Sequence, residues 1–87
     1  MSTVPLSEEI GIRTVWFDDQ TLFVKLSDGR TIGTPIAWYL RLQRASPAQR
    51  EHWRLIADGE GVHWPDVDED LRLEGMLAGR AAPGVVK

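Results

Sequence analysis

The sequence predicts a small α+β domain, in which an antiparallel meander of three to four strands packs against two or three short helices. Three observations predict this class. Apolar side chains alternate with polar ones in the first third of the chain, Asp28-Gly29 separates two such stretches, and Ser46-Pro47 opens a segment of helical character. The 87 residues fit one domain, which we place at residues 10–79 between terminal tails of residues 1–9 and 80–87.

The predicted strands come first along the chain. Residues 10–17 are rich in Ile, Val, Thr, Trp and Phe, and Asp18-Asp19 marks their end. Apolar residues then recur at every second position over residues 22–26. Asp28-Gly29 is a strong hairpin signal because Gly accepts a positive φ without steric cost, and residues 31–34 return as a third strand.

The helical segments follow Pro35, which we expect to end the sheet. Apolar spacing predicts a short helix within residues 36–45. Ser46 is a good helix cap, Pro47 suits the first helical position, and Gln49 completes a capping box. We expect this second helix to continue through Trp53 and Ile56, which would face the core, and to end near Gly59.

The last third of the chain is less regular. Residues 62–64 are candidates for a fourth strand, and residues 65–70 form an acidic turn. Leucines and a methionine over residues 71–77 predict a final short apolar element.

Composition excludes several classes of protein. The chain has no cysteine, which rules out disulfides, a thiolate nucleophile and cysteine-bound zinc. The longest apolar run is the five residues 36–40, whereas a membrane span needs about 18. The N-terminus has neither the basic start nor the apolar stretch of a signal peptide. We therefore expect a cytoplasmic protein that does not contact a membrane.

Charge is divided unevenly along the chain, although the net charge is only −3. Residues 30–54 carry five arginines against one acid, and residues 58–74 carry seven acids against one arginine. Such blocks either steer a partner or neutralise each other on neighbouring surfaces. Because the chain is acidic as a whole, with a pI near 5.2, we expect no direct contact with nucleic acid.

The acidic turn offers two chemical interpretations, and each has a weakness. Asp66, Asp68 and Asp70 are spaced like the start of a calcium-binding loop, but Leu71 and Leu77 occupy the positions that require Gly and Glu. His63 lies near these carboxylates, as general acid-base chemistry requires, yet no positioned nucleophile accompanies it. We therefore expect no metal, no cofactor and no catalytic residue.

The neighbouring aromatic residues Trp38 and Tyr39 are open to two interpretations. Both belong to the core, or one of them forms an exposed patch for a partner. Adjacent residues of a helix point about 100° apart, and exposed aromatic residues beside arginine are typical of interface anchors.

Five motifs, read together, carry a family resemblance. They are Ser27-Asp28-Gly29-Arg30, Pro35-x-x-Trp38-Tyr39-x-x-Leu42, Trp53-x-x-Ile56, Asp58-Gly59-x-Gly61-x-His63-Trp64-Pro65-x-x-Asp68-Glu69-Asp70 and Gly75-x-Leu77-x-Gly79. Their order and spacing over residues 10–79 resemble the bacterial domain of unknown function 2442 family. Leu40 stands where that family often has proline, which favours more helix here.

The resemblance implies a small α+β fold, with a sheet packed against short helices. It implies no established activity and supplies no catalytic residues. Some relatives resemble fusions to a helix-turn-helix module, and others resemble the small partner in toxin–antitoxin-like gene pairs. We expect this protein to lack such a fused module.

Two functional hypotheses follow. The first is a non-enzymatic protein-interaction module, antitoxin-like or regulatory, that binds a basic partner. We expect this partner to be a small basic protein encoded nearby. The predicted contact residues are Trp38, Tyr39, His63, Trp64, Asp66, Asp68, Glu69 and Asp70. The alternative is a small metal-dependent enzyme that uses His63 and the carboxylates of residues 66–70. A homodimer formed through a strand edge is compatible with both.

Overall fold

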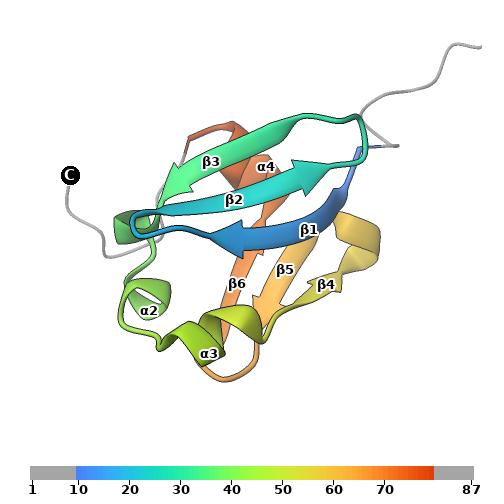
Figure 1. The fold of residues 1–87 in the computed structure, drawn as a ribbon. Coiled ribbons are helices and arrows are strands. Elements are labelled where there is room, and N and C mark those ends of the chain that lie inside the picture. The colour runs from blue at the N-terminus through green and yellow to red at the C-terminus, as the bar shows by residue number, and fades with distance from the viewer. Residues whose placement is uncertain (1–9, 80–87) are drawn as a thin grey trace, which may run out of the picture.

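Two three-stranded antiparallel sheets form the framework of residues 10–79, which are the residues that the computed structural model describes (Figure 1). The predicted tails, residues 1–9 and 80–87, lie outside the described residues. The first sheet has the order β1-β2-β3, formed by β1 (Ile12–Phe17), β2 (Thr21–Leu26) and β3 (Thr31–Pro35). The predicted meander is therefore confirmed.

Side chains of the first sheet alternate between the core and the solvent. Val15 and Val24 face inward, whereas Trp16 and Phe23 form a stacked pair on the outer face, with ring centroids 5.4 Å apart. The register shifts between Ile12 and Thr14, so that one extra residue keeps Ile12 in the core. The shift thus adds an inward-facing residue at the start of β1.

The two hairpin turns of this sheet form as their sequences predict. Asp18 accepts hydrogen bonds from the backbone N–H groups of Gln20 and Thr21, at 2.9 and 2.8 Å. Gly29 has a φ of 98°, and the Arg30 Nε donates to the Asp28 carboxylate at 2.8 Å. Each turn is therefore held by an aspartate side chain.

Short helical pieces connect the two sheets. The predicted helix within residues 36–45 is divided into η1 (Ile36–Trp38) and α2 (Leu40–Gln43), because Tyr39 between them is extended. The next helix, α3 (Pro47–Glu51), begins with the predicted capping box. Its Ser46 Oγ accepts from the Gln49 backbone N–H at 3.1 Å, and the Gln49 side chain accepts from the Ser46 N–H at 2.9 Å.

The predicted continuation of this helix to Gly59 is wrong. The chain leaves helical geometry at His52 and forms the strand β4 (Arg54–Ile56). In a longer helix the Arg50 carbonyl would accept from the N–H of residue 54. Here the Arg50 carbonyl accepts from the Trp64 indole Nε1 at 3.0 Å instead. The oxygen that a further helical turn would use as its acceptor is therefore bonded to a tryptophan 14 residues away.

The second sheet has the order β4-β5-β6, with β5 at Gly61–Trp64 and β6 at Glu69–Arg72. The tight turn η2 (Ala57–Gly59) joins β4 to β5, and α4 (Leu73–Leu77) follows β6. The candidate fourth strand is present as β5, although it belongs to this separate sheet. The acidic turn is shorter than predicted, because Glu69 and Asp70 are strand residues.

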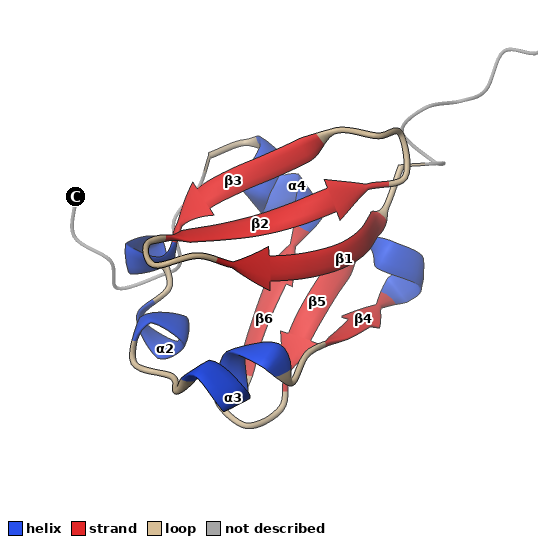
Figure 2. Ribbon diagram, viewed as in Figure 1, coloured by secondary structure: helices blue, strands red, loops and turns tan. Residues whose placement is uncertain are grey.

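The core lies between the sheets, which Figure 2 shows as two layers of strands. Trp64 of β5 has no exposed surface and packs edge-to-face with the Phe17 ring, with centroids 6.2 Å apart. Leu42 adds a fully buried side chain from α2. Within residues 10–79, no helix is both long enough and apolar enough to cross a membrane.

Candidate functional site

The acidic hairpin, which we define as residues 65–70, comprises the turn after β5 and the first two residues of β6. Asp68 has a φ of 54°, a left-handed conformation that Asp tolerates better than most residues. The Arg41 guanidinium of α2 donates a hydrogen bond to the Asp68 carbonyl oxygen. The turn is therefore tied to the helical connection between the sheets.

Two aspartates of the acidic hairpin pair with histidines. The Asp66 Oδ2 lies 2.9 Å from the Nδ1 of His52, the residue that follows α3. The Asp70 Oδ1 pairs with the His63 Nδ1 on the neighbouring strand. The Asp66 side chain is nevertheless 39% exposed and the Asp70 side chain 63% exposed. The pairs fix the carboxylates in place and leave them accessible to solvent.

Glu69 differs from the other acids of the hairpin because it is half-buried. Burial raises the pKa of its carboxyl group, an effect that the nearby Arg41 guanidinium opposes and that Asp70 and Asp68 increase. Glu69 is therefore less available to a partner than Asp68 or Asp70.

The structure corrects two of the predicted contact residues. Tyr39 is 2% exposed and Trp64 is fully buried, so neither side chain can contact a partner directly. Burial raises the pKa of the Tyr39 phenol, Glu69 raises it further, and the neighbouring Thr34 side chain opposes the rise. Trp38 is half-buried, with its ring edge-to-face against Tyr39 at 6.5 Å. It lies at the border of the core.

Sequence reasoning missed His52, Arg41 and Arg54. The strand register places Arg54, His63 and Asp70 in one row across the second sheet. Arg54 was expected on a helix, so its place in this row was hidden. His52 and Asp66 are 14 residues apart, and no local pattern announces their contact.

The histidine–aspartate pairs remain separate. Across residues 10–79, no three His, Asp or Glu side chains come together in a way that could hold a metal ion. The geometry therefore gives no support to the metal-dependent alternative.

The fold and this surface define a small α+β domain that presents an acidic hairpin between two strands. The sequence profile of the family described as "Protein of unknown function (DUF2442)" matches residues 12–82. The chain belongs to this family, as the motifs of the sequence suggest. No curated protein matches the chain.

Two solved structures share this fold. A protein of unknown function from Rhodospirillum rubrum is 28% identical, with a TM-score of 0.75 over 87% of this chain and 94% of that one. An uncharacterized protein from Chromobacterium violaceum is 22% identical, with a TM-score of 0.72 over 85% of this chain and 70% of that one. Both support the α+β architecture, and neither carries a described activity.

Proposed function

We propose that this protein is a non-enzymatic interaction module, antitoxin-like or regulatory, that binds a basic partner protein in the cytoplasm through its acidic hairpin. One observation carries the proposal. The Asp66 and Asp70 carboxylates are fixed by His52 and His63 and still lie open to solvent. A fixed carboxylate loses little conformational freedom when a cation of the partner approaches it.

The charges around the hairpin support the same function. Residues 65–70 carry four acids, which outnumber the two arginines beside them, Arg41 and Arg54. Charge of one sign attracts a complementary surface over several ångströms and raises the association rate. We expect the partner to be a small basic protein, and we expect its gene to lie nearby.

Binding of such a partner to a charge-neutralised variant tests the proposal. The variant is Asp68→Asn with Asp70→Asn, which neutralises two exposed carboxylates and leaves the half-buried Glu69 unchanged. Asn also tolerates the left-handed backbone at residue 68. The matched control, Asp19→Asn with Glu51→Gln, removes the same charge from exposed positions outside the hairpin.

The measurement is the affinity of the purified basic protein encoded next to this chain, titrated by calorimetry. We expect the hairpin variant to weaken binding about tenfold at low salt, with a smaller effect at high salt, and the control to bind as the wild type does. Equal affinity of all three proteins, or no binding by the wild type, would contradict the proposal.

A further inference from the structure

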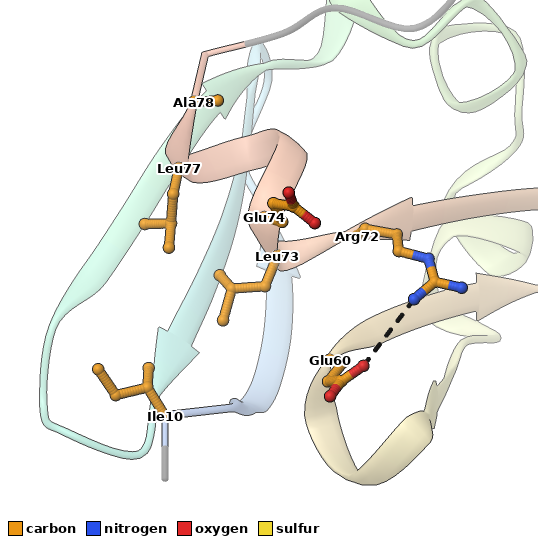
Figure 3. A pocket seen from close by; sticks show the side chains of 7 residues that line it. All are labelled: Ile10, Glu60, Arg72, Leu73, Glu74, Leu77 and Ala78. Atoms are coloured by element: carbon orange, nitrogen blue, oxygen red, sulfur yellow. Dashed lines mark ion pairs between the residues drawn. The ribbon is translucent and has the colours of Figure 1, made fainter. Parts of the chain in front are cut away.

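Two adjoining hollows lie at the end of β6 that is opposite the acidic hairpin. The first, the apolar groove, has a volume of about 860 Å³ and runs beside α4 (Figure 3). The second, the polar hollow, has a volume of about 670 Å³ and lies between the start of β1 and η2. Ile10 and Glu60 line both hollows, and we call the two together the trough.

Four apolar side chains line the apolar groove beside three charged ones. Leu73 is buried at its base, and Leu77 on the next turn of α4 is 48% exposed. Leu77 is the most exposed of the large hydrophobic side chains that the structure describes. Figure 3 shows Leu73, Leu77 and Ile10 around the same space. An apolar side chain placed there would cover surface that water now contacts.

Charged side chains border the trough on its other side. The Arg72 guanidinium lies 3.9 Å from the Glu60 carboxylate, and both side chains are well exposed, at 65% and 70%. So long and exposed an ion pair is weak, and Glu60 is therefore able to exchange partners at little cost. Asp58, Glu60 and Glu74 outnumber Arg13 and Arg72 along the trough, which favours an incoming cation.

The loop that carries Asp58 is held in a conformation that is unusual for its residues. Ala57 and Asp58 have φ values of 53° and 56°, in the left-handed region that non-glycine residues seldom adopt. A close backbone contact fixes the loop, since a Cβ on Gly59 would lie 3.0 Å from the N and O atoms of Ile12. Such strain persists where the surroundings impose it, and it is common at binding sites.

We infer that this trough docks a segment of a partner protein in which an apolar side chain lies close to a lysine or arginine. The apolar side chain enters the groove between Leu73, Leu77 and Ile10. The cation enters the polar hollow, beside Asp58 and Glu60. This surface is separate from the acidic hairpin, and the inference does not depend on the proposed function of the hairpin.

A random library of 12-residue peptides, displayed on phage and selected on the full-length protein, supplies the probes. We expect the enriched peptides to share a Leu, Ile, Met or Phe within four residues of a Lys or Arg. Enriched peptides without that pair, or no enrichment, would overturn the inference. The best peptide is then synthesised and titrated by fluorescence anisotropy.

Two leucine variants locate the binding surface. Leu77→Glu is expected to weaken peptide binding about tenfold or more, because it places a charge in the groove. Leu40→Glu is the matched control, since Leu40 is 37% exposed on α2 and does not line the trough. Unchanged affinity of Leu77→Glu, or an equal loss in both variants, would contradict the inference.

A double-mutant cycle tests the cation. Asp58→Asn with Glu60→Gln is expected to weaken binding several-fold, and Asn suits the left-handed backbone at residue 58. Replacing the peptide's cation with glutamine should cost as much in the wild type and almost nothing further in this variant. Additive losses would contradict the pairing. Self-association of the free protein that Leu77→Glu abolishes would instead assign the groove to a second copy of the chain.

Discussion

At the scale of single residues, Trp64 links the helical connection to the second sheet. Its ring fills the core and its indole N–H satisfies the Arg50 carbonyl. Phenylalanine would keep an aromatic ring at this position but would lose both the hydrogen bond and part of the buried volume.

We predict that Trp64→Phe lowers the free energy of unfolding by about 2 kcal/mol. Trp16→Phe is the control, because Trp16 is 39% exposed and should change stability by less than about 0.5 kcal/mol. Urea denaturation of both variants is the measurement. An equal effect of the two substitutions would show that the Arg50 contact adds nothing.

The glycines of this chain differ in what their positions require. We predict that Gly59→Ala destabilises the fold by about 2 kcal/mol or more, because φ is 92° and the new Cβ would meet the Ile12 backbone. Gly75→Ala lies within α4 with no neighbour inside 4 Å of the new Cβ. It should stabilise the protein by about 0.5 kcal/mol. Thermal unfolding distinguishes the two, and stabilisation by Gly59→Ala would refute the argument.

Glu69 gives the stability of the protein a dependence on pH. Because burial raises the pKa of its carboxyl group above the ordinary 4.5, the folded state holds this proton more tightly than the unfolded state. Its contribution to stability is therefore present at low pH and is lost as pH rises through the raised pKa.

We predict that Glu69→Gln is more stable than the wild type at pH 7, by less than about 1 kcal/mol because the group is partly solvated. The difference should shrink as pH falls to 4. Chemical denaturation across this range is the measurement, and a difference that grows toward low pH would reverse the sign of the argument.

At the scale of elements, local signals predicted the beginnings of elements better than their ends. The Asp28-Gly29 turn and the Ser46 cap act within a few residues, so the sequence shows them directly. The end of α3 depends on Trp64, 14 residues after Arg50, and no local pattern contains that information. Because the helix was predicted to continue to Gly59, β4 was not predicted, and neither was the place of Arg54 beside His63.

The capping box should account for much of the stability of α3. This helix has only five residues, too few for its own hydrogen bonds to sustain it. We predict that Ser46→Ala costs about 1 kcal/mol in the free energy of unfolding. Urea denaturation measures the loss, and Ser46→Asp, which keeps an N-cap acceptor, should restore most of it.

At the scale of the whole molecule, the two sheets share one core. Phe17 of the first sheet contacts Trp64 of the second, and Leu42 lies in the same buried cluster. The sequence predicted the α+β class, but Trp53 and Ile56, the two residues it placed in the core, are only half-buried. It did not predict a second sheet, because that depends on pairing between strands rather than on the pattern of any one strand.

We predict that the protein unfolds in one cooperative transition despite its two sheets. Neither sheet buries its inner face without the other, so partial unfolding would expose the shared core. Tryptophan fluorescence and far-UV circular dichroism should give the same midpoint in urea. Two separated midpoints would show that the sheets are independent.

The indole that ends α3 also sets an order of events during synthesis. The first sheet is complete once residue 35 has left the ribosome, because its three strands follow one another directly. Residues 52–56 must wait for residues 61–64, which supply both their strand partner and the tryptophan that stops the preceding helix. Until then, a nascent chain is free to extend that helix, and the arrival of Trp64 converts the segment into a strand.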